Sequence, residues 1–475
     1  MIEYLVSESR EGNLLKKLLR RAAAFVSQSF TGEFFTSRQV WNIFLPIFVD
    51  QAFIVCLSFL NTAMISSSGV NAVSAVNMVD SLNIFLVNIF IAVATGGTVV
   101  VAQYRGSGNE TMVSKSAAGA MSSVFLLAVG IGAFVIILHG PTLSVLFGNA
   151  DPQVLSLGKT YLIGSGLSYP GVAIMEAACG ALRGVGETKS SLILSLVNNV
   201  SYVLLNFLFI SSLNMSVFGM VLALNISRWF AAVCSIVYLV RINVSLKFHL
   251  RDAIRFNPAM LKKIFFIGIP FAAEQMFFNG GKILTQTFIV QLGTYAIAIN
   301  AIASSIIQLS QIAGNASCLC VVTLVGQCVG RKNIADARKF IRSFLVGSSV
   351  AFVIMTTALF PFFGGLIGLF SPPAQIVPTV RNILLMSGIF QIFLWSVSFV
   401  TPAALRAAGD AGFTSVVSML SMWLFRVVLG YILGIHTPLG ILGVWLAMDC
   451  EWGVRSVVFL LRYRGKKWYS HRLID

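Results

Sequence analysis

Seven ionisable residues interrupt the long apolar segments of this chain, and these side chains could bind an ion or a charged ligand. They are Asp50, Asp80, Glu274, Lys282, Arg426, Asp449 and Glu451. An ionisable group inside an apolar segment is costly, and it usually faces a polar cavity or a partner of opposite charge. We interpret these residues as binding residues or ion pairs, and we assign no catalytic residue.

Asp50 and Glu274 are the first candidates for binding, because their surroundings repeat. "LPIFVDQ" at 45–51 returns as "IPFAAEQ" at 269–275, which places one carboxylate at the same depth in each copy. A buried carboxylate can alternate between a protonated form and one neutralised by a cation, because burial disfavours the bare charge. Antiport needs this alternation. The alternative is that these acids only pair with Lys or Arg inside a helix bundle.

Asp80 and Lys282 extend this group. Asp80 lies one turn after Asn77, and we expect it to join Asp50 in the interior of the first copy. Lys282 follows Glu274 by eight residues, about two helical turns along the same side. It is a partner of Glu274, a charge of the cavity, or a side chain that extends to the membrane surface.

Arg426, Asp449 and Glu451 lie near the middle of the last two apolar segments. Adjacent antiparallel helices would bring these opposite charges together, and a buried pair leaves no net charge to titrate. We therefore predict a structural ion pair there.

Membrane-spanning helices must position these residues. The chain has 475 residues, 57% of them hydrophobic and 11% charged, with a mean hydropathy of +0.87, which is too apolar for a water-soluble protein. Its apolar runs are long enough to cross about 30 Å of hydrocarbon, so we predict an all-α integral membrane protein with about twelve spans. The predicted spans are 38–66, 70–104, 116–139, 156–180, 189–212, 215–240, 261–291, 294–328, 336–363, 377–403, 411–434 and 438–462.

The distribution of charge predicts the orientation. The net charge of +16 arises largely from Lys and Arg at alternate ends of the spans, whereas opposite connections such as "SSSGVNA" and "SPPAQIVPT" contain neither. This pattern places the basic ends and both termini in the cytoplasm, and it makes the basicity a sign of topology rather than of nucleic-acid binding. We expect a multi-pass protein of the cell (inner or plasma) membrane, acting as a monomer.

The rest of the composition indicates no metal or redox chemistry. "NLLKKLLRR", within residues 1–37, is an amphipathic basic segment on the cytoplasmic membrane surface, or else a frayed basic tail. The seven cysteines are scattered through the apolar spans and are expected to be packing residues. The four histidines are dispersed near span ends, which argues against a membrane-embedded enzyme. We expect no cofactor and no metal.

A repeated phrase indicates that the chain is a duplication. "ALRGVGETK" at 181–189 returns 223 positions later as "ALRAAGDAG" at 404–412, and other similar segments keep an offset of 224. A constant offset indicates two copies of one unit, related by a pseudo-two-fold axis along the membrane normal. Glycine permits tight turns, so we predict cytoplasmic clasps between helices rather than a nucleotide site. The residues of these loops are Arg183, Gly186, Glu187, Arg406, Gly409 and Asp410.

The duplication divides the chain into five parts. They are a cytoplasmic N-terminal segment (1–37), a six-helix lobe (38–240), a cytoplasmic bridge (241–260), a second six-helix lobe (261–462) and a cytoplasmic tail (463–475). We expect the two lobes to rock against each other about the bridge.

The chain closely resembles the multidrug and toxic compound extrusion (MATE) transporters from about residue 38 to 468. The resemblance is carried by "GALRGVGETKSSLILSLVNNVSYVLLNFLF", "PAALRAAGDAGFTSVVSMLSMWLFRVVLGYIL" and "NTAMISSSGVNAVSAVNMVDSLNIFLVNIF". It implies two six-helix lobes around a V-shaped cavity. It also implies export of amphipathic, often cationic, compounds in exchange for inward Na⁺ or H⁺.

The chain departs from this family in its first span. Many members carry an aspartate followed by T-x-x-x-x-x-x-G, where this chain reads "NTAMISSSG" with Asn61. Asparagine cannot titrate, so either Asp50 has taken over the acidic role or this lobe lacks it. The resemblance maps a polar pocket onto Asn199, Tyr202 and Asn206, which share one helix face. The alternative is that they form hydrogen bonds between helices.

We therefore predict a secondary active exporter in which Asp50, Asp80 and Glu274 alternately hold H⁺ or Na⁺ and an amphipathic cationic substrate. The alternative is a flippase for lipid-linked saccharides of related architecture. A flippase would need a basic cavity for pyrophosphate, whereas the ionisable residues noted within the spans are more acidic than basic.

Overall fold

The computed structural model describes residues 27–66, 69–147, 151–255, 257–368, 370, 372–471 and 473–474, except for the side chains of 58–66 and 70. Most of these residues are helical and none of them forms a strand, which confirms the predicted all-α class. The basic segment "NLLKKLLRR" lies outside the described residues.

The first lobe contains the helices before residue 243. Its long helices are α2 (Ser37–Ser66), α3 (Val70–Ser107), α4 (Glu110–Ile137), α6 (Pro152–Val185), α7 (Thr188–Asn206) with η1 (Phe207–Ser212), and α8 (Ser216–Val237) with η2 (Tyr238–Ile242). The short helix α5 (His139–Phe147) connects α4 to α6.

The second lobe follows the short connecting helix α9 (Leu250–Ile254). Its helices are α10 (Pro258–Gln291), α11 (Thr294–Ser310) with α12 (Ile312–Gly330), α13 (Ile334–Leu359) with η3 (Phe360–Phe362) and α14 (Phe363–Gly368), α15 (Val377–Phe390) with η4 (Gln391–Trp395) and α16 (Ser396–Ala407), α17 (Ala411–Ser421) with η5 (Met422–Leu429) and α18 (Gly430–Ile435), and α19 (Ile441–Arg464). The 3-10 turn η6 (Lys467–Tyr469) lies in the tail.

These helices coincide with the predicted spans, but several extend further at their basic ends. For example, α4 begins at Glu110 because the side chain of Asn109 caps it, accepting a hydrogen bond of 3.1 Å from the Met112 amide. Within the described residues, nine helices are long and apolar enough to cross a membrane, judged by length and composition. The long helices α6, α10 and α19 are not among them, and α10 and α19 carry ionisable residues along their length.

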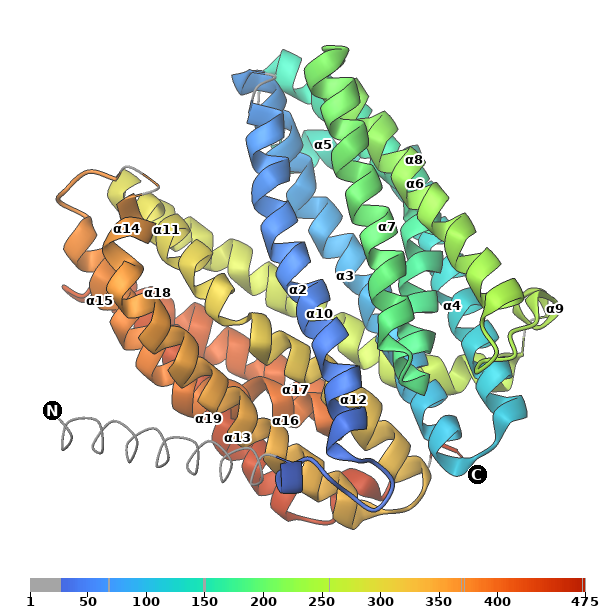
Figure 1. Cartoon of the computed structure of the whole chain (residues 1–475). Coiled ribbons are helices and arrows are strands. Elements are labelled where there is room, and N and C mark those ends of the chain that lie inside the picture. Colours follow the sequence, from blue (N-terminus) through green and yellow to red (C-terminus); the bar gives the residue numbers. More distant parts are fainter. Residues whose placement is uncertain are drawn as a thin grey trace, which may run out of the picture.

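The two lobes form the arms of a V (Figure 1). The helices of the first and second lobes approach each other at the end near α9 and diverge toward the end that carries α5 and α14. This is the arrangement of two separate six-helix bundles that share one contact region, and it agrees with the predicted fold.

The contact between the lobes is reciprocal where α3 meets α12. A Cβ atom on Gly106 would lie 2.1 Å from the Gln327 carbonyl oxygen, and one on Gly330 would lie 2.0 Å from the Gln103 carbonyl oxygen. The Gln103 side-chain amide donates to the Ala407 carbonyl at 2.8 Å. Gly106 matches Gly330 and Gln103 matches Gln327 between the copies, so the contact repeats about a two-fold axis. The predicted pseudo-two-fold relation is confirmed.

The first helix of each lobe also packs against the other lobe. Helix α2 contacts α7 of its own lobe and α12 of the second lobe. Helix α10 likewise contacts α17 of its own lobe and α3 of the first lobe. Each of these helices contains a proline, Pro46 in α2 and Pro270 in α10. Proline leaves the carbonyl four residues earlier without its usual donor, and in α2 that carbonyl, Asn42 O, accepts a hydrogen bond of 3.3 Å from the Thr188 hydroxyl.

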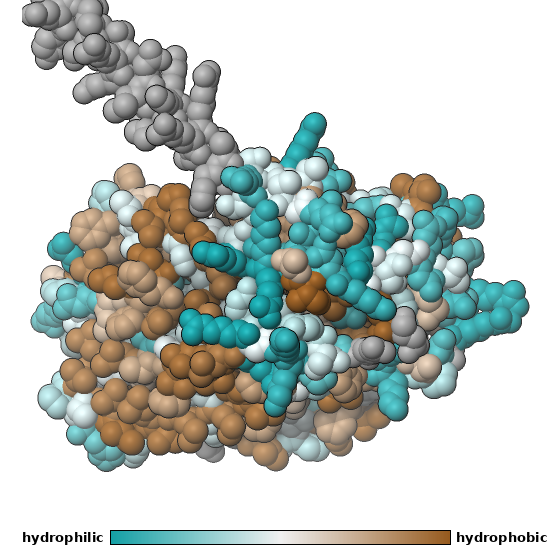
Figure 2. Space-filling view, turned by 90° about the horizontal axis from the view of Figure 1, so that it is seen from below, coloured by the Kyte–Doolittle hydropathy of each residue, from teal (hydrophilic) through white to brown (hydrophobic). Residues whose placement is uncertain are grey.

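The end where the lobes meet carries the basic connections. Figure 2 shows this end from below, with hydrophilic side chains across the middle and right of the face and hydrophobic ones gathered mainly on its left and lower side. The exposed cations at the helix ends and connections include Lys115, Lys189, Arg241, Lys247, Arg251, Arg255, Lys262, Arg331, Lys332, Lys339, Arg464, Lys466 and Lys467. That the face lies in the cytoplasm remains a prediction.

The connection 241–260 is packed on the first lobe. The Ser114 hydroxyl donates to the Lys247 carbonyl at 2.8 Å, and the Lys247 ammonium lies 2.6 Å from the Glu110 carboxylate. These contacts tie the connection to the start of α4. Because the connection is fixed to the first lobe, it does not form the hinge between the lobes alone. Motion between the lobes must also change the contacts of α2, α3, α10 and α12.

The described part of the N-terminal segment lies on the second lobe. The Asp336 carboxylate accepts a hydrogen bond of 2.8 Å from the Glu33 amide, and the Asn333 side chain donates to the Glu33 carboxylate at 2.7 Å. Phe30 packs edge-on against Phe344, with ring centroids 5.1 Å apart. The chain thus crosses from the second lobe into α2 of the first lobe.

Candidate functional site

The two repeated loops end helices and bind neighbouring segments of the chain. Gly186 has φ +92° and Gly409 has φ +104°, which only glycine adopts readily. In the first loop the Glu187 carboxylate accepts a hydrogen bond from the side chain of Asn243. In the second, the Asp410 carboxylate accepts two hydrogen bonds from Arg462, at 2.7 and 3.0 Å. Both acids therefore clasp neighbouring segments.

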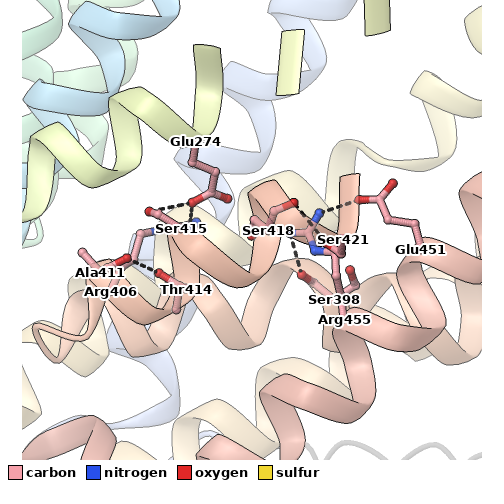
Figure 3. A network of polar contacts seen from close by, with 10 residues as sticks. All are labelled: Glu274, Ser398, Arg406, Ala411, Thr414, Ser415, Ser418, Ser421, Glu451 and Arg455. Atoms are coloured by element: carbon pink, nitrogen blue, oxygen red, sulfur yellow. Dashed lines mark hydrogen bonds and ion pairs between the residues drawn. The ribbon is translucent and has the colours of Figure 1, made fainter. Parts of the chain in front are cut away.

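The arginines of the same loops each lie near a carboxylate inside their own lobe. Figure 3 shows Arg406 of α16 beside Glu274 of α10, with Arg406 Nη1 3.0 Å from Glu274 Oε2. The Ser415 hydroxyl of α17 donates to the same oxygen at 3.0 Å. Glu274 is buried and its charge is balanced by Arg406. The sequence analysis treated the carboxylate and the loop arginine separately, and the structure brings them together.

The matching position in the first lobe is less well balanced. The Asp50 carboxylate faces Ser195 of α7, and Arg183 of α6 acts on it electrostatically. Arg183 also lies 3.9 Å from the Glu176 carboxylate and donates to the Ser191 hydroxyl at 3.4 Å. One arginine therefore serves two carboxylates here, whereas Glu274 has an arginine of its own.

Asp80 lies in a separate network of neutral donors. The Tyr161 hydroxyl donates to Asp80 Oδ1 at 2.8 Å, and Asn83 Nδ2 lies 3.3 Å from the same atom. Asn83 in turn accepts a hydrogen bond of 2.7 Å from Tyr169. Among the described residues, no basic nitrogen lies within 4.0 Å of the Asp80 carboxylate, and Arg228 acts on it only at longer range. Asp80 and Asp50 thus have different partners, and that they act together in the interior of the first lobe stays a prediction.

The polar residues of the fifth span lie between these two groups. Asn199 donates to the Ser195 hydroxyl at 3.3 Å, which places it beside the Asp50 region. Tyr202 lies close to Tyr161 and Asn206, in the Asp80 region. The side chain of Asn61 lies outside the described residues.

In the second lobe, Glu451 of α19 receives two arginines. Arg426 Nε lies 2.7 Å from its Oε2 atom, and Arg455 Nη1 lies 3.1 Å from its Oε1 atom (Figure 3 shows the second contact). Asp449, which we had expected in this ion pair, instead accepts a hydrogen bond of 3.2 Å from Ser387. Arg455 was missed, although its spacing of four residues after Glu451 places both on one helix face.

The interior is more basic than the sequence analysis suggested. The sequence-based set of charges within the spans did not include four arginines. Two of them, Arg183 and Arg406, lie just beyond predicted spans, whereas Arg228 and Arg455 lie inside them. In the structure, Arg183 and Arg406 act on carboxylates inside their lobes. The buried positive and negative charges must therefore be compared within each lobe separately.

Comparison with known proteins agrees with this architecture. Residues 46–209 and 270–432 each match the MatE family. The chain belongs to the MatE family. The two matched ranges are offset by 224 residues at their starts and 223 at their ends, which confirms the duplication.

Relatives of this MatE protein align over most of their length. It is 27% identical to "Uncharacterized transporter YisQ" of Bacillus subtilis over 436 residues, covering 90% of this chain and 94% of the relative. It is 25% identical to "Probable multidrug resistance protein NorM" of Thermotoga maritima over 444 residues, covering 92% and 94%. Members of the family are transporters, so this multi-pass membrane protein is a transporter and not an enzyme.

Solved structures share the fold. One, titled "Outward-facing conformation of a multidrug resistance MATE family transporter of the MOP superfamily", aligns with a TM-score of 0.82 at 17% identity, covering 90% of this chain and 94% of that one. Another, titled "Reverse polarity of binding pocket suggests different function of a MOP superfamily transporter from Pyrococcus furiosus", gives 0.81 at 17% identity with the same coverage. These likenesses support the arrangement of twelve helices in two lobes.

Proposed function

We propose that this MatE protein is a secondary active exporter that exchanges amphipathic compounds for H⁺ or Na⁺ by alternating access. The family match and the relatives named as probable multidrug resistance proteins support export of small foreign compounds. The V-shaped arrangement of the lobes in Figure 1 suits a mechanism in which they rock about a shared contact. The family match does not favour the alternative of a saccharide-lipid flippase.

Asp80 is the residue best placed to carry the coupling ion or to hold a cationic substrate. Its carboxylate has only neutral donors, Tyr161 and Asn83, within hydrogen-bonding distance among the described residues. A carboxylate inside a membrane protein that lacks an ion pair must be neutralised by a proton, a metal cation or a cationic ligand. These occupants exclude one another, and such competition is the basis of exchange.

Asp50 and Glu274 have secondary roles in this proposal. Asp50 shares Arg183 with Glu176, so the three groups together carry an excess negative charge that a proton or cation can balance. Glu274 is already neutralised by Arg406 at 3.0 Å. It is available for a cation only in a conformation that separates it from this arginine.

The test is transport in everted membrane vesicles. A fluorescent cation should be pumped by the wild-type chain and by Asp151→Asn, a control that removes an exposed carboxylate but keeps a side chain able to cap α6. Asp80→Asn should abolish pumping while the protein remains in the membrane at normal levels. Varying Na⁺ at fixed pH, and pH at fixed Na⁺, identifies the coupling ion. Full pumping by Asp80→Asn would refute the assigned role.

A further inference from the structure

Two cations approach the same aromatic ring inside the second lobe. Lys282 Nζ lies 4.8 Å from the centroid of the Phe278 ring, and Arg426 Cζ lies 5.2 Å from the same centroid. The two cations come from different helices, α10 and η5. Lys282 is exposed, whereas Arg426 is only 7% exposed. The pair thus extends from the surface of the lobe into its interior.

The carboxylates nearby do not balance these cations. Glu451 is shared by Arg426 and Arg455. Asp449 bonds to Ser387 and forms no ion pair with any described residue. Lys282, Arg426 and Arg455 therefore face at most two carboxylates, which leaves at least one positive charge in excess. An unbalanced charge at membrane depth is costly, and a bound anion would relieve this cost.

The unused hydrogen-bonding groups of the cations are donors, and Asp449 Oδ1 and Glu451 Oε2 of the same region are acceptors without a hydrogen bond. Within the described part of the chain, Lys282 Nζ has no carboxylate within 4.0 Å and its recorded contact is the Phe278 ring. Buried Arg455 Nε likewise has no acceptor among the described atoms. Ammonium and guanidinium groups can only donate, so the partner that Lys282 lacks is an acceptor, and the excess positive charge favours an anionic one.

We propose that Lys282 and Arg426 form a binding site for an anionic group, a carboxylate or a halide, in the second lobe. The first lobe has the opposite balance, because Asp80 is unpaired and Arg183 serves two carboxylates. If the exporter function proposed above holds, the site receives the carboxylate of an exported compound whose cationic end is held by the first lobe. The preferred substrates are then zwitterionic amphiphiles. A free chloride ion is the other source of the same chemistry.

The test uses the purified full-length protein and needs no ion gradient. Thermal unfolding is followed while sodium chloride or sodium benzoate is titrated at constant ionic strength. We expect a saturable rise in the unfolding temperature with at least one of these salts, and an apparent affinity at least tenfold weaker in Lys282→Met. Lys282→Arg should retain binding. Lys262→Met, which removes an exposed lysine from the cytoplasmic end of the same helix, should behave as wild type.

The outcomes separate the sources of the anion. Stabilisation by benzoate but not chloride identifies the carboxylate of a substrate, whereas stabilisation by chloride alone identifies a resident counter-ion. Stabilisation by neither salt, or equal stabilisation of wild type and Lys282→Met, overturns the proposal. If Lys282→Met does not fold, Lys282→Gln takes its place, and competition between chloride and benzoate in the wild type gives a second measurement. Because binding is measured without a gradient, failure of ion-coupled transport would leave this result unaffected.

Discussion

The glycine contact between α3 and α12 gives the sharpest prediction, because it leaves no room for a methyl group. In Gly106→Ala, the new Cβ would lie 2.1 Å from the backbone oxygen of Gln327. Carbon and oxygen atoms in close contact are ordinarily about 3.3 Å apart. The two helices must therefore separate by more than about 1 Å at the point where α3 meets α12.

The cost of this separation can be bounded from the contacts. Overpacking of a filled contact typically costs about 1–3 kcal/mol. Separation also threatens the hydrogen bond of 2.9 Å from the Gln327 side chain to the Gly184 carbonyl, and an unsatisfied buried group costs about 1–3 kcal/mol more. Even a total of about 2 kcal/mol changes the ratio of two conformations by about 30-fold. We expect Gly106→Ala to favour the conformation in which the lobes separate at their basic end.

The assay is a distance measurement between spin labels in a background without native cysteines. Lys115→Cys in α4 and Lys339→Cys in α13 place exposed labels on opposite lobes. Gly106→Ala should add a population at longer distance. The control is Gly130→Ala in α4, where a Cβ would meet nothing within 4 Å, and which gains the same helix propensity of about 1 kcal/mol. Identical distance distributions in Gly106→Ala and wild type would refute the reasoning.

Three further predictions concern stability and orientation. Glu274→Gln leaves Arg406 buried without its partner, which should lower stability by about 3–5 kcal/mol; an unchanged unfolding temperature of the purified protein would contradict this. Glu451→Gln removes the one carboxylate shared by two buried arginines and should reduce the yield of folded protein, with size-exclusion profiles as the readout. A cysteine replacing Lys466 should react with an impermeant maleimide only from the cytoplasmic side and one replacing Leu213 only from outside; the reverse result would invert the proposed topology.

The helices and the duplication could be predicted from the sequence because both rest on local patterns. Apolar runs of span length and an offset that stays near 224 do not depend on how the helices pack. The errors in helix ends arose because polarity changes before the helix stops. For example, α4 continues to its cap at Asn109, beyond the apolar part of the sequence. The π-helical segments η1, η4 and η5, which interrupt the α-helices, have no comparable pattern in the sequence.

The candidate site was only partly predictable, because contacts between distant segments depend on which helix faces meet. Glu274 and Arg406 were both singled out, but nothing in their spacing indicates that the loop arginine bends inward to the carboxylate. Asp80 was expected to join Asp50 in the interior of the first lobe, but no pattern in the sequence indicated that Tyr161 of α6 is its partner. Arg455, four residues after Glu451, was the exception, since helix periodicity alone would have found it.

The reciprocal contact of Gly106 and Gly330 bears on the origin of the protein. Each half supplies one glycine and one glutamine at matching positions, so each half contains both members of the contact. A single six-helix chain with these residues would have been self-complementary and able to assemble as a symmetric dimer before its gene was doubled and fused. In the fused chain the two halves became free to diverge. Their buried charges now differ, while the glycine and glutamine residues of the contact between them are the same in both halves.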